Sequence, residues 1–223
     1  MNPDVLRIAI FGPESTGKSE LATKLGARFQ APVVAEYARE FWDAHGVITL
    51  EDMVPIAREQ WRREDEAVAR VAAELSRTCN LLGYTSAGNA EGAAENCNLI
   101  GYTRGARAPL VVCDTEALTT MLWSDLLYGT TPDEVRRGAE KRCRNYALYL
   151  LLDTDVAWAP DPQRCFPDPE DREKCRRIWH GALERRQLPY VWIRGDWAER
   201  ERAAIAAMES VLRSAGEGGR ASR

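Results

Sequence analysis

The 223-residue sequence has no apolar run close to the roughly 18 residues of a membrane-spanning helix, and its N-terminus lacks a basic-then-apolar leader. Its six cysteines include no C-x-x-C pair, which favours reduced thiols over a disulfide framework. It also has no basic excess, because 30 Lys and Arg face 34 Asp and Glu, and this balance does not indicate a nucleic-acid surface. We therefore expect a soluble, cytoplasmic protein whose partners are small molecules, with its oligomeric state left open.

One stretch carries a specific chemical signature. Residues 12–19 read Gly-Pro-Glu-Ser-Thr-Gly-Lys-Ser, which matches G-x-x-x-x-G-K-[ST] between an apolar run and a helix-like run. Such a loop curls its backbone N–H groups around phosphate oxygens, and the positive end of the following helix strengthens the attraction. We expect Lys18 to reach the β- and γ-phosphates of ATP and Ser19 to ligate Mg²⁺. The residues assigned to ATP are Gly12, Glu14, Ser15, Thr16, Gly17, Lys18 and Ser19.

The length suits one α/β domain, predicted over residues 1–213 with a flexible tail at 214–223. Apolar runs typical of strands alternate with helix-like runs, which predicts a parallel sheet with right-handed crossovers. Strands are expected at 5–11, 32–35, 109–116, 147–152 and 189–193. Helices are expected at 20–29, 49–73 (with Thr49 as N-cap and Asp52 as its capping-box partner), 118–129, 132–141, 170–187 and 198–212.

The segment 79–107 breaks this pattern, because it is rich in Gly, Asn, Ser and Ala. The run that begins at Cys79 nearly repeats at Cys97, but two copies are too few for a solenoid. We interpret the segment as an insertion of unknown role, either a small hairpin-like excursion or a mobile lobe. No His or further Cys completes a metal site with the two cysteines, and whether they interact is left open.

Two of the predicted strands lead into acidic residues, at the sheet edge where open α/β folds bind ligands. Glu36 follows the second strand and could accept the proton of a substrate hydroxyl, although a local ion pair with Arg39 would fit the same pattern. Asp114 ends the third strand in the form of a Walker B element. It is expected to hold Mg²⁺ opposite Ser19, and an acidic helix cap is the alternative.

The proline-rich stretch 158–172 is predicted to be a lid. Arginines on a lid can stabilise the charge that spreads over a transferred phosphoryl group, which makes Arg164 and Arg172 candidates. The alternative is that they are exposed loop arginines with no role. At this point the residues predict a nucleotide- and Mg²⁺-dependent enzyme with an acidic pocket and a lid.

These motifs together resemble the ribosylnicotinamide kinase domain of NadR-type proteins. The resemblance rests on the segments at 12–19, 36–40, 113–116 with Thr119 and Thr120, 128–129, 158, 161–164, 169–173 and 189–190. It covers nearly the whole chain except about 79–107. It implies a P-loop kinase with strand order 2-3-1-4-5 that phosphorylates the 5′-hydroxyl of nicotinamide riboside, giving nicotinamide mononucleotide for NAD biosynthesis.

The resemblance also implies roles for individual residues. Glu36 would orient or deprotonate the 5′-hydroxyl, Asp114 with Ser19 would hold Mg²⁺, and Lys18 with the lid arginines Arg164 and Arg172 would neutralise developing charge. Glu40 and Glu116 would bind the ribose diol, and Tyr37, Trp123, Tyr128 and Trp158 are either stacking partners for a cationic pyridinium or core aromatics. The substrate side as a whole is assigned to Glu36, Tyr37, Arg39, Glu40, Glu116, Thr120, Trp123, Tyr128, Trp158 and Asp161.

Three features depart from the family pattern. Glu116 stands where an Asp is usual, Pro162 replaces the glycine of the lid pattern Asp-Gly-x-Arg and stiffens the lid, and the segment 79–107 could reach the substrate side. Two other functions remain open, namely a kinase of another nucleoside-like molecule and a regulatory P-loop ATPase with no small-molecule acceptor. The preference between ATP and GTP is open as well.

Overall fold

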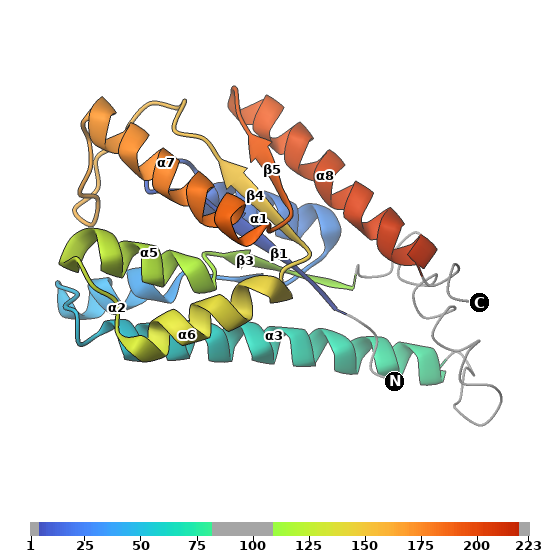
Figure 1. Cartoon of the computed structure of the whole chain (residues 1–223). Helices are drawn as coiled ribbons and strands as arrows, with labels where there is room; N and C mark the ends of the chain where they lie inside the picture. The colour runs from blue at the N-terminus through green and yellow to red at the C-terminus, as the bar shows by residue number, and fades with distance from the viewer. Residues whose placement is uncertain (1–4, 82–108, 219–223) are drawn as a thin grey trace.

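A computed structural model describes residues 5–81 and 109–218, with side chains at 5–77 and 109–215. Its centre is one sheet of five strands: β1 (Leu6–Phe11), β2 (Val33–Val34), β3 (Leu110–Asp114), β4 (Leu148–Leu152) and β5 (Tyr190–Ile193). The order is β2-β3-β1-β4-β5 and every neighbouring pair is parallel, which confirms the predicted fold class (Figure 1). Because β1 is the central strand, the phosphate loop leaves from the middle of the sheet's carboxyl edge.

Helices cover both faces of the sheet. They are α1 (Lys18–Phe29), α2 (Tyr37–His45), α3 (Met53–Leu81), α5 (Ala117–Tyr128), α6 (Asp133–Arg142), α7 (Pro169–Arg186) and α8 (Trp197–Gly218), with a 3₁₀ turn at Cys143–Asn145. Strand β1 alternates between two cores: Ile8 and Ile10 pack with α1 and α8, while Ala9 and Phe11 pack with α3, α5, α6 and α7. This period of two is what places a parallel strand between two helical layers.

The sequence missed helix α2. The second strand was expected at 32–35 and no helix was predicted after it, but β2 stops at Val34 and a helix begins at Tyr37. It ends at Gly46, whose left-handed φ of 74° and N–H bond to the Trp42 carbonyl oxygen at 2.7 Å form a C-cap. No residue of α2 is buried, although its sequence is amphipathic, with the apolar side chains gathered on one side of the helix.

Helix α3 begins later than predicted. Asp52 does bond to Thr49, with its Oδ2 accepting from the Thr49 N–H at 2.8 Å and from its hydroxyl at 2.7 Å. Both donors are therefore used inside a turn that precedes the helix, and Thr49 is not its N-cap. The first helical residue is Met53, and the helix continues past Ala73 to Leu81.

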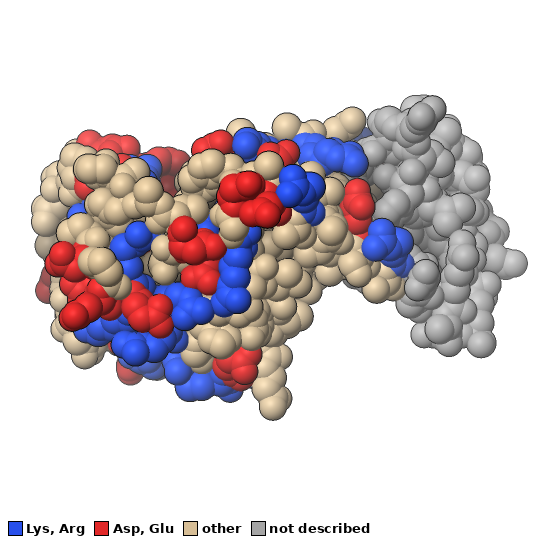
Figure 2. All heavy atoms as spheres, turned by 90° about the horizontal axis from the view of Figure 1, so that it is seen from above, with Lys and Arg blue, Asp and Glu red and all other residues tan. Residues whose placement is uncertain are grey.

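Two other predicted boundaries also shift. Helix α3 takes in residues 79–81 of the predicted insertion, and α8 takes in residues 214–218 of the predicted tail. The rest of the insertion, including Cys97 and the side chain of Cys79, lies outside the described residues. None of the helices in the described ranges combines the length and the hydrophobicity that crossing a membrane requires. Acidic and basic side chains lie next to one another on the face seen in Figure 2.

Candidate functional site

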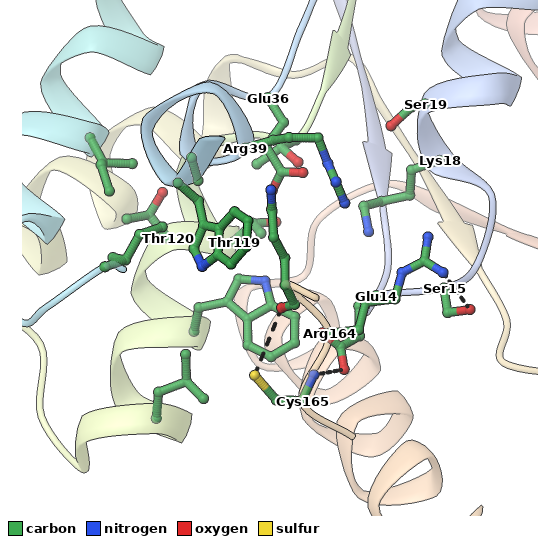
Figure 3. Close-up of a pocket in the computed structure, with 18 of the residues that line it drawn as sticks. Glu14, Ser15, Lys18, Ser19, Glu36, Arg39, Thr119, Thr120, Arg164 and Cys165 are labelled. Atoms are coloured by element: carbon green, nitrogen blue, oxygen red, sulfur yellow. Dashed lines mark hydrogen bonds between the residues drawn. The ribbon is translucent and has the colours of Figure 1, made fainter. Parts of the chain in front are cut away.

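A cavity of about 660 Å³ opens at the carboxyl edge of the sheet. The phosphate loop and the first turn of α1 form one wall, α2 with the turn after it and α3 form a second, and α5 with the lid closes the rest. Figure 3 shows side chains from these elements pointing into the same space. The volume lies within the range of about 300–1,000 Å³ that is usual for small-molecule sites.

The phosphate loop depends on glycine at both ends. Gly12 has a φ of 150° and Gly17 a φ of 82°, which are conformations that other residues rarely adopt. A Cβ on Gly12 would lie 2.9 Å from the carbonyl oxygen of Leu152, so the close approach of the loop to β4 also requires glycine. The loop leads directly into α1, whose N-terminal N–H groups and dipole make this an anion-binding geometry.

Lys18 is the first residue of α1 and lies across the loop. Its Nζ donates to the Pro13 carbonyl oxygen at 2.8 Å, and the Thr16 hydroxyl donates to the same oxygen at 2.9 Å. The ammonium group is therefore held over the loop, where a nucleotide's phosphates would enter. The loop residues assigned to phosphate, from Glu14 to Ser19, all line the cavity, and only Gly12 lies behind it.

Glu36 lies at the N-terminus of α2, where its side chain makes no capping bond and instead faces the cavity (Figure 3). Burial raises the pKa of this carboxyl group, the nearby Asp114 raises it further, and the charges of Lys18 and Arg39 oppose the shift. A carboxylate with a raised pKa, facing a cavity beside the phosphate loop, has the position and the basicity to accept a proton from a hydroxyl.

Arg39 forms its ion pair with the lid. Its Nη1 donates to Asp161 Oδ2 at 3.1 Å, across a separation of 122 residues. The sequence left open a local ion pair between Glu36 and Arg39, but in the structure Arg39 pairs with Asp161 instead. Arg39 lines the cavity, whereas Asp161 lies behind it and ties the lid to α2.

Asp114 ends β3 and is only 4% exposed. Burial raises the pKa of its carboxyl group, while a hydrogen bond from Ser19 and the charges of Lys18 and Arg39 oppose that shift. Within the described part of the chain its Oδ1 is buried and has no hydrogen-bond partner. The N-cap of the following helix is Glu116, so Asp114 does not serve as the helix cap that was its alternative role.

These two oxygen donors fit a magnesium ion. Mg²⁺ prefers carboxylate and hydroxyl oxygens, and it usually keeps several water or phosphate ligands. The Ser19 hydroxyl and the unpartnered Asp114 Oδ1 would supply the protein's share. Across residues 5–81 and 109–218 no cluster of three or more His, Cys, Asp or Glu could hold a metal, so nucleotide phosphates and water would complete the coordination.

Glu116 was predicted to bind the ribose of the substrate, but the structure places it away from the cavity. Glu116 is fully buried and does not line the cavity. It caps α5, accepting from the N–H groups of Leu118 at 2.7 Å and Thr119 at 3.0 Å and from the Thr119 hydroxyl at 3.1 Å. Burial raises its pKa to about 8. In this chain Glu116 is therefore the helix cap that holds the start of α5.

The lid is bonded to the phosphate loop. Glu14 Oε1 accepts from the backbone N–H groups of Cys165 at 2.8 Å and Phe166 at 2.7 Å. Ser15 Oγ accepts from the N–H of Ala159 at 2.9 Å. Both contacts join segments about 150 residues apart, and they hold the segment predicted as a lid against the phosphate loop.

The two lid arginines differ in position. Arg164 lines the cavity and its Nη1 lies 3.4 Å from Ser15 Oγ (Figure 3). Arg172 donates to the Val156 carbonyl oxygen at 2.8 Å and lies behind the cavity. Both guanidinium groups lie over the ring of Trp158, at 5.9 and 5.8 Å from its centroid. Trp158 therefore supports the lid and does not line the cavity.

Three of the predicted substrate residues line the far end of the cavity, namely Thr120, Trp123 and Tyr128 on α5. Trp123 stacks on Phe166 of the lid with an interplanar angle of 7°, and the Tyr128 hydroxyl donates to the Ile48 carbonyl oxygen at 2.6 Å. The ring of Trp123 is thus fixed by packing on the lid, and α5 is tied to the turn before α3.

Two more predicted substrate residues, Tyr37 and Glu40, lie outside the cavity, as Glu116, Trp158 and Asp161 do. Glu40 is exposed and accepts from both Nη atoms of Arg63, at 2.6 and 2.8 Å. The same guanidinium lies 4.5 Å from the centroid of the Tyr37 ring. Arg63 on α3 therefore holds the outer side of α2, and neither residue reaches a ligand in the cavity.

The sequence missed the apolar wall opposite α5. It consists of Trp42 on α2, the turn after it and the start of α3, including Val47, Ile48, Met53 and Ile56, and it faces Leu127 of α5 across the cavity. Trp42 lies three residues after Arg39, so a helix prediction over this segment would have placed both on one face. Val47 and Leu127 are 57% and 43% exposed, and they form an apolar rim at the entrance.

A family model described as "AAA domain" matches residues 7–86 and 88–200 of this chain. No curated protein matches the sequence. The similar solved structures include two of NadR protein. One is of NadR protein in complex with NR, with 19% identity and a TM-score of 0.63 over 94% of this chain and 52% of that chain. The other is of NadR protein in complex with NAD and AMP-PNP, with 17% identity and a TM-score of 0.57 over 94% of this chain and 50% of that chain.

The chain therefore spans about half the length of these solved structures. At this identity the likeness is one of fold, and the shared fold is that of a P-loop kinase.

Proposed function

The chain belongs to the AAA domain family, and from this premise and the cavity we propose that it is a kinase that phosphorylates the 5′-hydroxyl of nicotinamide riboside. The phosphate donor is ATP and the product is nicotinamide mononucleotide, which supplies NAD biosynthesis. The neighbours described as bound to NR and to NAD with AMP-PNP support this choice of ligands.

One observation carries the proposal: the phosphate loop and Glu36 face the same cavity from two different strands. Lys18 marks where the terminal phosphate of a nucleotide would lie, and Glu36 marks where an acceptor hydroxyl would approach it. An ATPase without an acceptor needs no second compartment beyond the phosphates. This cavity continues past Glu36 to the apolar wall and α5, which leaves room for a riboside.

Glu36 positions the hydroxyl and takes its proton. Burial raises its pKa, which makes it a better base than an exposed glutamate, while the charges of Lys18 and Arg39 favour its ionised form. The proton moves from the 5′-hydroxyl to a Glu36 carboxylate oxygen as the oxygen attacks phosphorus. Glutamine at this position could still accept a hydrogen bond from the hydroxyl, but it could not take the proton.

Lys18 and Arg164 stabilise the charge on the transferred group. Phosphoryl transfer leaves little covalent work for a protein, so positioning and charge supply most of the rate. A bound Mg²⁺ would neutralise and orient the phosphate oxygens, and Ser19 and Asp114 are the residues that would hold it. The lid excludes water through its bonds to Glu14 and Ser15, which favours transfer to the riboside over hydrolysis.

The far end of the cavity suits a flat aromatic cation. Trp42, Trp123 and Tyr128 contribute aromatic surface, and ring faces stabilise a positive charge such as that of a pyridinium. The nearest acids of the cavity, Glu14, Glu20 and Glu36, belong to the phosphate loop, α1 and the start of α2. The base would therefore be recognised by stacking, and Thr120 offers a hydroxyl to a polar substituent such as a carboxamide.

The test is an assay of ADP release with ATP and Mg²⁺, run with and without nicotinamide riboside, and with mass spectrometry of the product. We expect release to depend on the riboside and the product to be its 5′-monophosphate. Parallel reactions with adenosine, cytidine and uridine, and with GTP as donor, define the acceptor and the donor. Equal ADP release with and without an acceptor would contradict the proposal. Faster turnover of another nucleoside would identify that nucleoside as the substrate in place of nicotinamide riboside.

A further inference from the structure

The first turn of α8 contacts the phosphate loop through residues that do not line the cavity. Arg200 is 1% exposed, yet it lies outside the cavity and has no part in the mechanism above. Its Nη1 donates to the Thr16 carbonyl oxygen at 3.2 Å and its Nη2 to the Asp153 carbonyl oxygen at 3.0 Å. Its Nε donates to the Gly195 carbonyl oxygen at 2.9 Å, and Asp155 accepts from Nη2. One guanidinium therefore joins the phosphate loop, the end of β4 and the turn after β5.

Trp197 contacts the next residue of the loop. A Cβ built on Gly17 would lie 2.5 Å from the Trp197 ring, so this ring packs directly on the glycine backbone. The Arg200 guanidinium lies 5.6 Å from the centroid of the same ring. Two residues of α8 thus hold two consecutive residues of the phosphate loop.

The bond to Thr16 has a geometric consequence for nucleotide binding. A trans peptide is planar, and its C=O and N–H point in opposite directions. Because the Thr16 carbonyl points towards Arg200, which lies outside the cavity, the N–H of Gly17 points away from Arg200, and Gly17 itself lines the cavity. That N–H is one of the donors that a phosphate-binding loop offers.

We propose that Arg200 is a positioning residue for the nucleotide: by holding the Thr16 carbonyl, it orients the Gly17 N–H towards the phosphates. The inference rests on the proposed function, because it concerns the nucleotide of that same site. A buried arginine is costly unless its donors are paired, and here they are paired with backbone oxygens of three segments and with Asp155. Asp155 also accepts from the Gly195 N–H at 2.8 Å, so it fixes the guanidinium within the turn.

The test compares Arg200→Lys and Arg200→Met with the control Arg202→Met, an exposed arginine on the same helix. Asp155→Asn is a milder variant that leaves Arg200 in place but removes its charge partner. Thermal unfolding first identifies the variants that fold. Amide hydrogen exchange is then measured on the peptide covering residues 12–19, and the affinity for AMP-PNP is measured by calorimetry without any acceptor.

We expect faster exchange across residues 12–19 and a loss of AMP-PNP affinity of about tenfold in folded Arg200→Met, which corresponds to about 1.4 kcal/mol. Asp155→Asn should give an intermediate loss and Arg202→Met none. Arg200→Lys should recover part of the affinity, because an ammonium can bond one or two of the carbonyls. Unchanged exchange and affinity in a folded Arg200→Lys or Asp155→Asn variant would overturn the proposal. Neither readout uses nicotinamide riboside, so failure of the proposed substrate would leave this result unaffected.

Discussion

Glu14 of the phosphate loop accepts a hydrogen bond of 2.8 Å from the backbone N–H of Cys165 in the lid. The same oxygen accepts from the next N–H of the lid, and burial raises the pKa of the carboxyl group. Glu14 therefore lines the cavity and also connects the phosphate loop to the lid. Its side chain couples the loop that holds phosphate to the segment that covers it.

Replacing Glu14 by alanine should loosen the lid. Two N–H groups of the lid would lose their acceptor, and a hydrogen bond to a charged group contributes about 1.5–3 kcal/mol. We expect kcat/KM to fall about 10- to 100-fold, and limited proteolysis to cut faster within residues 158–168. Glu14→Gln is the matched control, because its amide oxygen can still accept from both N–H groups. Equal proteolysis of Glu14→Ala and the wild type would show that the lid does not depend on this contact.

Glu36→Gln tests the base. The amide keeps the shape of the side chain but cannot take a proton, so kcat should fall by about 10²–10⁴, the usual contribution of general base catalysis. Affinity for ATP should change less than about twofold, because the phosphate loop is untouched. Glu40→Gln, four residues along α2 and outside the cavity, should keep near-normal turnover. Comparable turnover in the Glu36 and Glu40 variants would remove Glu36 from the mechanism.

Trp42→Ala tests the apolar wall. An aromatic face contributes about 0.5–2 kcal/mol to binding a cation, so the KM for the riboside should rise about 3- to 30-fold while the KM for ATP stays constant. Trp61→Phe is a suitable control, because Trp61 packs against α6 outside the cavity. Initial-rate kinetics with each substrate varied in turn provide the measurement. A rise in the KM for ATP alone would mean that this wall serves the nucleotide.

Glu64 provides a prediction for the dependence of stability on pH. It is fully buried, accepts from the Tyr146 hydroxyl at 2.6 Å, and burial raises its pKa to about 7. Between pH 4.5 and 7 the unfolded chain loses this proton and the folded chain keeps it. The free energy of unfolding should therefore decrease as the pH rises through this window, by up to about 3 kcal/mol from this group.

Glu64→Gln should flatten that decrease, since the amide does not titrate and can still accept from Tyr146. The control is Glu66→Gln, an exposed residue on the same helix that pairs with Arg62. Urea unfolding at pH 5, 6, 7 and 8 measures both variants against the wild type. An identical pH slope in Glu64→Gln and the wild type would show that Glu64 is ionised in the folded protein throughout.

The sequence was sufficient to predict the sheet and the conformation of the glycine loop, whose residues Glu14 to Ser19 line the cavity. Both depend on local patterns: buried strands are continuous apolar runs, and the loop needs glycine at fixed spacing. The acceptor side was only partly predictable. Trp42 lies on the nine-residue helix α2, which was not predicted, and the use of Glu116 as a helix cap depends on how deeply the start of α5 is buried. Arg200 was missed because nothing near it in sequence shows that α8 reaches the phosphate loop.

Asp114→Asn should separate stability from activity. The Asp114 carboxyl group is buried, and its Oδ1 has no hydrogen-bond partner in the described part of the structure, so ionising it without metal costs folding energy. Removing the charge should leave the melting temperature without Mg²⁺ unchanged or raise it. Activity should fall by at least about 100-fold, because a neutral amide is a weak ligand for Mg²⁺.

Asp125→Asn, at a surface ion pair on α5, controls for loss of an acidic residue. Melting curves of the wild type with and without Mg²⁺ and AMP-PNP complete the test: we expect the ion and nucleotide together to stabilise the wild type and to stabilise Asp114→Asn much less. Equal stabilisation of both proteins would place the ion elsewhere.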